Sequence, residues 1–355
     1  MTSTPAAPGS RAPLLGALPG EAVPYSLASG DGLRRVVDGQ LVTIIARGAD
    51  TGDQFAAAYV SGDRGAEFPV LAHPQESRTI IVFDGLLQVR VGDTTQVLAV
   101  GDEAVVPAGT AFGYRMLANR TRFLLWSTTG ASIELLDRLG TPTDGHVHPP
   151  RRSGASLRSE AVEVARELGF AASPFDGGEP VLRHGDRRPA GVEPYVLSAG
   201  EGEHLAGFNQ MHTFTSRGAN TGGDYFTVHS SGARAGYIPL HFHERHTENF
   251  FCFEGRVWLH VNGEELLLTK GDFVHAPAGT IHSYAFDSHH TQMIGMLSPD
   301  IFEPFFDYMF EPTDERVHTE TVEPYFNSAG FGRVQSELDI VVVGAPPLRA
   351  KALDL

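Results

Sequence analysis

The residues best suited to chemistry in this chain form a short histidine-rich cluster. His241 and His243 are two residues apart, Glu248 follows them, and His282 comes 34 residues after Glu248. Residues i and i+2 of a β-strand point to the same face, so the first two imidazoles would project together. Three neutral imidazoles and one carboxylate form a mixed nitrogen and oxygen set that suits Mn, Fe, Co, Ni, Cu or Zn. The cluster therefore predicts a metal site without naming the metal.

Other reactive side chains are weaker candidates, because a single histidine in a chain with 16 of them usually has a structural role. His246 is either a donor behind the ligands or a solvated loop residue. The rest are expected in structural or surface positions: His260 and His275 on strands, His289 and His290 in a loop, and the single cysteine, Cys252, in the core. Four aromatic residues either line a pocket or fill the core: Phe250, Phe251, Phe253 and Trp258.

An internal repeat defines the elements that must position this cluster. Residues 24–115 align with residues 194–285 without a gap at an offset of 170, and 28 of the 92 pairs are identical. Pro107-Ala108-Gly109-Thr110, for example, recurs as Pro277-Ala278-Gly279-Thr280. Most shared positions are Gly, Pro, Ser or Thr, which determine turns, so the repeated object is a β scaffold. The sequence predicts a duplicated all-β domain.

The first copy differs from the second at the positions of the cluster. Leu71, His73, Arg78 and Phe112 stand where His241, His243, Glu248 and His282 stand in the second copy. One arginine and two apolar side chains cannot hold a divalent cation, so we expect this domain to be metal-free. Its interior would be filled by packing and by a buried ion pair of Arg78. A second ligand pocket without a metal is the alternative.

The length and composition support this organisation and exclude several classes of protein. With 355 residues, of which 41% are hydrophobic and 20% charged, the chain can form two cored domains. The formal net charge of -16 argues against nucleic acid or anionic lipid as a partner. The chain contains no run of 18 apolar residues and no signal peptide, so we expect a soluble, cytoplasmic protein. A homodimer is compatible with the sequence.

Two segments outside the repeat have helical character. Leu157–Phe170 has helical spacing, with Ser159 as the expected N-cap and Gly169 as the stop. Residues 300–310 are aromatic and could form a helix over a barrel mouth. The expected organisation is an N-terminal barrel over residues 20–140, a linker over 141–190 and a C-terminal barrel over 191–335.

The cluster and its surrounding glycines resemble the motifs of a known superfamily. The pattern His241-X-His243-X4-Glu248-X6-Gly255, followed by Gly271-X5-Pro277-X-Gly279-X2-His282, is similar to the two motifs of the cupins. Two positions depart from the family pattern, Gly236 and Phe286, and neither is a candidate ligand. The resemblance implies two tandem jelly-roll barrels, with the four ligands pointing into the second.

Within that superfamily, the segment from His241 to Gly255, HFHERHTENFFCFEG, is most similar to quercetin 2,3-dioxygenases. The resemblance implies an oxidoreductase that uses one divalent transition metal (Ni, Mn, Fe, Co or Cu, with Zn also compatible), dioxygen and a small aromatic substrate. It implies that Glu248 accepts a proton from an acidic enol or phenol. Cleavage of a flavonol would then release carbon monoxide and leave a depside ester. In the fungal members the metal lies in the first barrel, whereas here only the second can hold it.

Three other functions stay open at this point. A dioxygenase or cyclase acting on another aromatic, polyketide-like phenolic could use the same site. An oxalate-decarboxylase-like enzyme would also use three His and one Glu, but those enzymes generally keep both metal sites. A non-enzymatic storage or sensor cupin is the third, and the intact set of four ligands argues against it.

Overall fold

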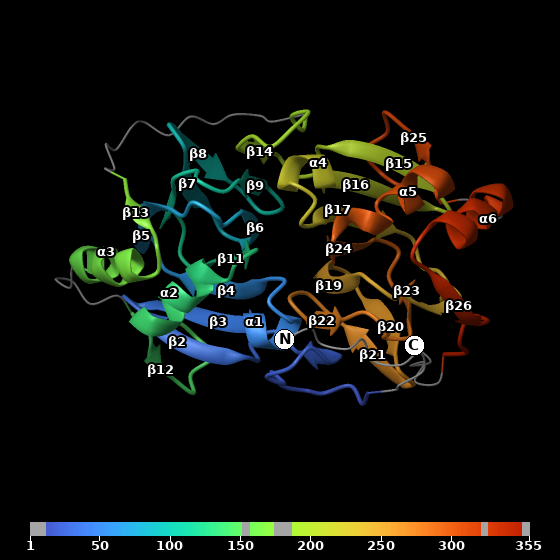
Figure 1. The fold of residues 1–355 in the computed structure, drawn as a ribbon, viewed down its shortest axis with the longest axis horizontal. Coiled ribbons are helices and arrows are strands. Elements are labelled where there is room, and N and C mark those ends of the chain that lie inside the picture. The colour runs from blue at the N-terminus through green and yellow to red at the C-terminus, as the bar shows by residue number, and fades with distance from the viewer. Residues whose placement is uncertain (1–11, 151–156, 174–186, 321–325, 350–355) are drawn as a thin grey trace. The chain divides into compact units, whose positions relative to one another are not determined.

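The structure is a computed structural model that describes residues 12–150, 157–173, 187–320 and 326–349. The chain divides into two compact units (Figure 1). We call Gly30–Glu201 the N-terminal barrel, and the described residues of Met1–Ser29 and Gly202–Leu355 the C-terminal barrel. Each unit contains one eight-stranded and one five-stranded sheet. This confirms the expected all-β fold of two tandem barrels with short helical segments.

The N-terminal barrel consists of two sheets in which neighbouring strands are hydrogen-bonded. The eight-stranded sheet runs β12 (Thr141–Pro142), β2 (Leu33–Val37), β3 (Gln40–Ala46), β4 (Ala56–Gly62), β11 (Thr121–Ser127), β6 (Arg78–Asp84), β9 (Glu103–Val106) and β14 (Tyr195–Leu197). The five-stranded sheet runs β13 (Ala171–Ala172), β5 (Glu67–Ala72), β10 (Phe112–Met116), β7 (Leu87–Val91) and β8 (Thr94–Leu98).

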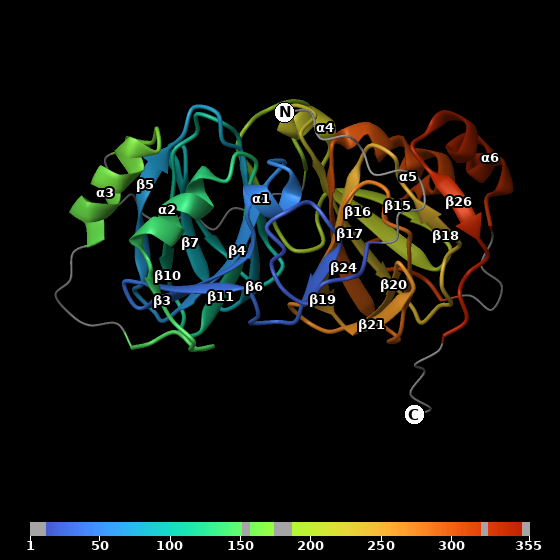
Figure 2. The ribbon, with the colours of Figure 1, turned by 60° about the horizontal axis from the view of Figure 1, so that its bottom comes forward.

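The C-terminal barrel repeats this plan. Its eight-stranded sheet runs β1 (Tyr25–Leu27), β22 (Phe273–Ala276), β19 (Thr247–Glu254), β24 (Thr291–Ser298), β17 (Phe226–Gly232), β16 (Gln210–Ser216), β15 (Glu203–Gly207) and β25 (Glu311–Pro312). Its five-stranded sheet runs β21 (Glu264–Leu268), β20 (Val257–Val261), β23 (His282–Phe286), β18 (Leu240–Phe242) and β26 (Val341–Gly344). Figure 2 shows β16 and β17 side by side in this unit.

Short helices accompany the strands: α1 (Gly48–Thr51), α2 (Ala131–Leu139), α3 (Leu157–Glu167), α4 (Gly218–Thr221), the 3-10 helix η1 (Asp300–Phe302), α5 (Pro304–Met309) and α6 (Ser328–Glu337). The expected helix at residues 300–310 is present as η1 and α5, and its aromatic residues pack on the C-terminal barrel core. The expected linker helix is α3, and Gly169 follows it with a left-handed φ of 86°. Ser159 lies inside α3 and not at its cap, because the helix has already begun at Leu157.

The first strand of each sequence copy pairs with the sheet of the other copy. β1 pairs antiparallel with β22, Tyr25 opposite His275, and β14 pairs with β9, Tyr195 opposite Val105. The expected boundaries of 20–140 and 191–335 differ from this arrangement, because they assign each of these strands to its own copy. Both strands begin with a tyrosine that follows a proline, so the sequence contains no local signal for the exchange.

The core of each barrel lies between its two sheets. In the N-terminal barrel, Val60 and Leu125 from the large sheet belong to the same buried cluster as Val89 from the small one. The corresponding cluster of the C-terminal barrel joins Phe250 and Val274 to Leu259. Burial of these apolar side chains stabilises the sandwich by about 25 cal/mol per Å² removed from water.

One repeated glycine shows why turn residues are shared between the copies. Gly255 has a φ of 74°, and a Cβ atom there would lie 2.5 Å from the carbonyl oxygen of His290. Gly85, its equivalent, has a φ of 81° and would collide with Thr121. Only glycine fits such a position. Among the helices of the described residues, none is long and apolar enough to span a membrane.

Candidate metal centre

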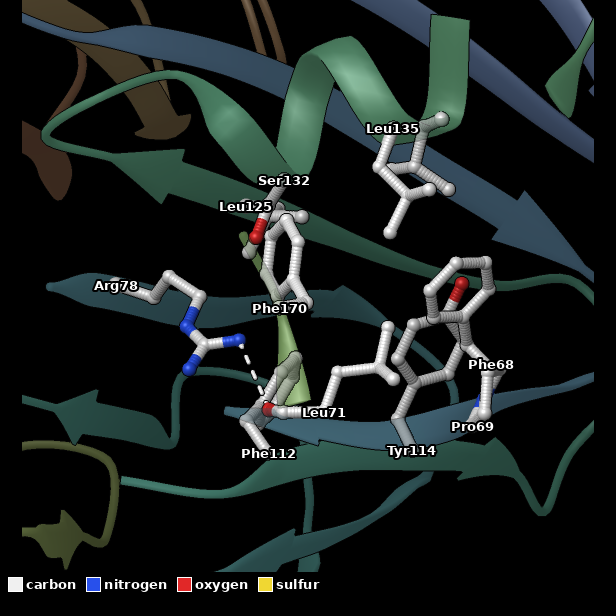
Figure 3. A pocket seen from close by; sticks show the side chains of 11 residues that line it. Phe68, Pro69, Leu71, Arg78, Phe112, Tyr114, Leu125, Ser132, Leu135 and Phe170 are labelled. Carbon is white, nitrogen blue, oxygen red and sulfur yellow. Dashed lines mark hydrogen bonds between the residues drawn. The ribbon is translucent and has the colours of Figure 1, made fainter. Parts of the chain in front are cut away.

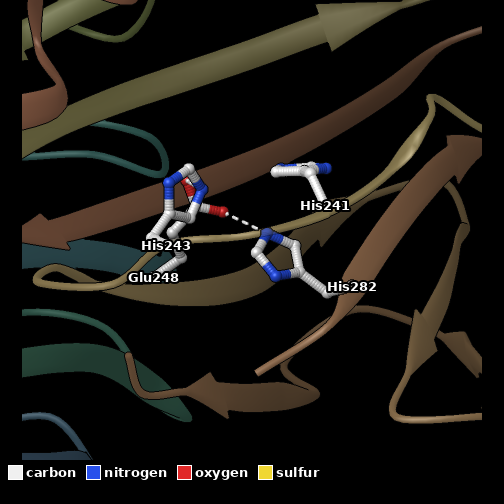
Figure 4. A group of neighbouring side chains, drawn as sticks. All are labelled: His241, His243, Glu248 and His282. Carbon is white, nitrogen blue, oxygen red and sulfur yellow. Dashed lines mark hydrogen bonds and ion pairs between the residues drawn. The ribbon is translucent and has the colours of Figure 1, made fainter. Parts of the chain in front are cut away.

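The four predicted ligands come together in the C-terminal barrel (Figure 4). His241 on β18 and His282 at the start of β23 are register partners in the small sheet, and His243 follows directly after β18. Glu248 comes from β19 of the large sheet. One potential ligand atom from each residue lies within 4.8 Å of all the others, and all four side chains are buried. The two sheets therefore direct one compact donor set into the barrel interior.

Hydrogen bonds to backbone carbonyls orient the three imidazole rings. Nδ1 of His241 lies 2.9 Å from the carbonyl oxygen of Pro239, and Nδ1 of His282 lies 3.0 Å from that of Thr280. Nδ1 of His243 contacts the carbonyl oxygen of Asp339. A carbonyl only accepts, so each Nδ1 carries the proton and each Nε2 keeps its lone pair. Nδ1 protonation of this kind is the arrangement that metal-binding histidines commonly show.

The electrostatics of the cluster favour the protonation states of metal ligands. Burial lowers the pKa of His241 well below its usual value, and burial lowers the pKa of His243 to about 4. Burial alone would raise the pKa of Glu248, but the neighbouring His243 and the imidazoles that contact its carboxylate lower it well below its usual value. Glu248 Oε2 lies 2.9 Å from His282 Nε2 and Oε1 lies 3.4 Å from His243 Nε2. The low pKa values of His241 and His243 and the ionised carboxylate of Glu248 suit a divalent transition metal.

Two further residues surround the donor set, His246 and Asp339. His246 is buried and lies between two carboxylates, with Nε2 3.5 Å from Glu248 and Nδ1 3.3 Å from Asp339. Burial would lower the pKa of His246, but hydrogen bonds to Asp339 and Glu248 raise it. Of the two interpretations that the sequence left open, the structure therefore supports the donor behind the ligands and not the solvated loop.

Asp339 is the residue that the sequence reasoning missed. Its carboxylate accepts hydrogen bonds from the backbone N–H groups of Glu244 and Arg245, each at 2.9 Å, and of His246, at 3.1 Å. Its own carbonyl oxygen accepts from His243. Asp339 therefore holds the loop between β18 and β19 from a segment that follows the internal repeat. It carries no motif, and only its position just before the apolar run at 340–343 could have indicated a role.

Aromatic side chains close one side of the cluster. The Phe302 ring of η1 stacks on His246, with centroids 4.8 Å apart, and meets His243 edge-on at 4.5 Å. Phe250 approaches His282 at 5.6 Å. Phe251 points away from the barrel interior onto Phe273. Of the four aromatic residues left open by the sequence, Phe250 is therefore the one in contact with a ligand.

The remaining candidates have structural positions. Cys252 is buried in the core, and burial raises the pKa of its thiol to about 12, which keeps it protonated. His260 lies on β20 and His275 on β22, as expected. His289 and His290 lie in the bend before β24. Trp258 packs with Tyr237 and Ala285 in a separate small cluster.

The N-terminal barrel presents a charge-reversed version of this site (Figure 3). Arg78 stands at the position of Glu248, and Glu76 at that of His246. The buried guanidinium donates to the carbonyl oxygens of Thr110 at 2.8 Å and Leu71 at 3.5 Å and lies 3.9 Å from Glu76. Thr110 is the equivalent of Thr280, whose carbonyl orients His282 in the other barrel. Arg78 on β6 thus contacts Leu71 on β5 and Thr110 in the turn before β10. The expected buried ion pair of Arg78 is confirmed by its contact with Glu76.

Space remains beside this guanidinium. About 320 Å³, part of it open to solvent, is lined mainly by apolar side chains: Phe68, Pro69, Leu71, Phe112, Tyr114, Leu125, Leu135, Leu136 and Phe170, together with Arg78 and Ser132. Among the described residues, the groups of three or more metal-donor side chains lie in the C-terminal barrel.

Comparison with known proteins places this geometry in a family. Residues 232–294 match the family model described as a cupin domain. The chain is 37% identical over 302 residues to a quercetin 2,3-dioxygenase of Bacillus subtilis, covering 84% of this chain and 90% of that protein. It is 26% identical over 150 residues to a quercetin 2,3-dioxygenase of Aspergillus japonicus, covering 40% of this chain and 41% of the relative.

A solved structure of a Bacillus subtilis oxalate decarboxylase variant aligns with a TM-score of 0.50 at 13% identity, covering 78% of this chain and 77% of the other. This likeness supports the two-barrel fold alone. The sequence similarity is closer and extends over both barrels, which indicates an oxidoreductase. The chain belongs to the quercetin 2,3-dioxygenase family of cupin proteins.

Proposed function

We propose that this protein is a metal-dependent dioxygenase that cleaves a flavonol such as quercetin and releases carbon monoxide. The observation that carries the proposal is the buried set of three histidines and one glutamate in the C-terminal barrel. The similarity to proteins named quercetin 2,3-dioxygenase supports the substrate class. The reaction balances with dioxygen alone, because both oxygen atoms enter the products and one ring carbon leaves as carbon monoxide.

We assign His241, His243, Glu248 and His282 as the ligands of one divalent ion. Their Nε2 lone pairs and the ionised carboxylate fit Ni, Mn, Fe, Co, Cu or Zn. The bound ion would supply a positive charge that favours deprotonation of a substrate hydroxyl and holds the hydroxy-ketone end of a flavonol. The protein side chains would supply the general base and the apolar surface for the substrate rings.

Glu248 acts as the general base in this proposal. Its carboxylate is ionised, so it can accept the proton of the acidic 3-hydroxyl group of a flavonol. His246 lies 3.5 Å behind Oε1 and fixes the orientation of the carboxylate, while Asp339 fixes His246. Phe302 and Phe250 provide apolar surface against which a planar ring system can pack and from which water is excluded.

Anaerobic absorption spectroscopy followed by oxygen admission tests the proposal. Mixing the metal-loaded protein with quercetin should shift the flavonol absorption band to longer wavelength, because the hydroxyl group loses its proton. Admitting oxygen should then bleach the band, with carbon monoxide formed in equal amount to the flavonol consumed. Absence of a shift and of oxygen uptake with flavonols, combined with both effects for a different phenolic compound, would transfer the function to that compound.

A further inference from the structure

A second polar pair, His212 and Ser230, lies in the C-terminal barrel apart from the four proposed ligands. His212 on β16 is the register partner of Ser230 on β17, and its Nδ1 lies 2.8 Å from the Ser230 hydroxyl. Both residues are buried. Nε2 of His212 has no hydrogen-bond partner among the described residues. A buried polar atom without a partner costs about 1–3 kcal/mol, so this nitrogen requires an explanation.

His212 faces the same interior as the proposed ligands. Gln210, two residues earlier on β16, accepts a 3.1 Å hydrogen bond from the hydroxyl of Tyr284, and Tyr284 stands two residues after His282 on β23. Side chains two residues apart on a strand share a face. The inward rows of β16 and β23 therefore face each other, one with His212 and the other with His282.

Two phenylalanine rings pack against the imidazole of His212. The Phe310 ring lies 4.1 Å from it and the Phe306 ring 5.2 Å, both measured between centroids. Burial lowers the pKa of His212 to about 3, so the ring is neutral near pH 7. A neutral imidazole with one nitrogen satisfied by Ser230 has the other available to a hydroxyl group.

The internal repeat supplies an independent comparison. The residues 170 positions earlier are Val42 and Val60, which are register partners on β3 and β4 and belong to the N-terminal barrel core. The hydrogen bond between Tyr284 and Gln210 has an equivalent in the N-terminal barrel, where Tyr114 donates to Gln40 at 2.8 Å. The scaffold therefore packs well with two valines at these positions. The His212 and Ser230 pair occurs in the barrel that has the complete donor set.

We propose that His212, held by Ser230, forms a hydrogen bond with a ring hydroxyl of the substrate other than the hydroxyl next to the metal. The inference rests on the proposed function and deepens it, because it makes the site selective for polyhydroxylated flavonols. A site built to bind a substrate hydroxyl discriminates against an analogue that lacks it. His212 is thus a specificity-determining residue.

The test compares two substrates in two variants. Quercetin carries hydroxyl groups on both outer rings, whereas 3-hydroxyflavone carries only the group next to the carbonyl. The ratio of kcat/KM for these two substrates should fall at least about tenfold when His212→Val and Ser230→Val are combined, as one lost hydrogen bond predicts. The ratio of their dissociation constants, quercetin over 3-hydroxyflavone, should rise in anaerobic absorbance titration, because weaker binding means a larger dissociation constant.

A matched control is available on the same strand. His229 is a buried histidine next to Ser230, and its Nδ1 contacts Gln292 at 3.2 Å on the opposite face of the sheet. His229→Val makes the same chemical change outside the barrel interior and should leave the ratio unchanged. Metal content and thermal unfolding temperature are measured for each variant. If the double variant does not fold, Ser230→Ala and His212→Gln are tested for the same ratio.

The outcomes separate this inference from the proposed function. If the native protein turns over both flavonols and the double variant keeps the native ratio, His212 is structural and the inference is overturned. An equal change of the ratio in the His229 control overturns it as well. If the metal-loaded native protein neither binds nor oxidises any flavonol, the proposed function fails and this inference fails with it.

Discussion

At the scale of single residues, four differences between the copies separate the proposed metal site from the interior of the N-terminal barrel. Leu71, Glu76, Arg78 and Phe112 stand where the second copy has His241, His246, Glu248 and His282. Glu248 and Arg78 occupy the same position in the two copies, and each lies near a buried side chain that also differs between the copies, His246 in one and Glu76 in the other. The carbonyl oxygen of Thr110 accepts a hydrogen bond from the Arg78 guanidinium, and that of Thr280 accepts one from the His282 imidazole. The backbone therefore tolerates both solutions, and the side chains determine which chemistry a barrel can perform.

Glu248→Gln should abolish turnover more than it lowers metal content. Three imidazoles still hold the ion, but an amide cannot accept the substrate proton. Loss of a positioned general base typically costs about 10²- to 10⁴-fold in rate. Steady-state kcat and elemental analysis of the same preparation measure the two effects. Near-normal turnover with metal bound would mean that Glu248 is a ligand and not the base.

Asp339→Ala should weaken metal binding without removing a ligand. The change leaves the N–H groups of Glu244, Arg245 and His246 without their acceptor and releases the loop that carries His243. Loss of such an outer contact typically lowers metal affinity about 10- to 100-fold. Competition with a chelator measures the affinity. The exposed Asp314→Ala has the same change in charge and should retain native affinity.

The residues of the site were predictable to different degrees for a physical reason. The four ligands are close in sequence or fixed by turn residues, so their spacing reports the geometry directly. Asp339 contacts the same loop from far along the chain, and no motif surrounds it; its position before the apolar run at 340–343 is the single local signal. His246 was left open because burial, which decides its role, depends on the packing of Phe302 over it.

At the scale of elements, the sequence predicts the presence of strands better than it predicts which strands pair. The repeat at offset 170 predicts the two barrels, and the aromatic run at 300–310 predicts the helix that forms η1 and α5. The exchange of β1 and β14 was not predictable, because the two strands read Tyr-Ser-Leu and Tyr-Val-Leu and their residues do not distinguish one sheet edge from the other. β26 was likewise not expected beyond residue 335.

The C-terminal segment should be required for metal binding. β26 pairs with β18, where Val342 stands opposite His241, and Asp339 precedes this strand. A chain ending at residue 335 loses both, so we expect loss of most bound metal and a lower unfolding temperature. A chain ending at residue 349 keeps all of these contacts and serves as the control. Equal metal content in the two shortened chains would contradict the assigned role of the segment.

At the scale of the whole molecule, duplication has produced two barrels with one fold and different interiors. We expect one tightly bound metal per chain, because the four proposed ligands lie in the C-terminal barrel and the equivalent positions of the other hold Leu71, Arg78 and Phe112 beside His73. Elemental analysis gives the stoichiometry. Two metals per chain, or full occupancy after His241→Ala combined with His282→Ala, would refute the assignment.

The stability of the metal-free protein should depend on pH partly through His212. Burial lowers the pKa of this ring from 6.5 to about 3, so the unfolded chain binds its proton at a higher pH than the folded chain does. The stabilisation is complete above pH 6.5 and is lost as the pH falls towards 3. From pH 6.5 to 5 one such group contributes a loss of at most about 2 kcal/mol. Urea unfolding at pH 6.5 and pH 5 should therefore show a smaller decrease for His212→Val than for the native chain. Equal decreases would mean that the His212 ring does not remain neutral because of burial.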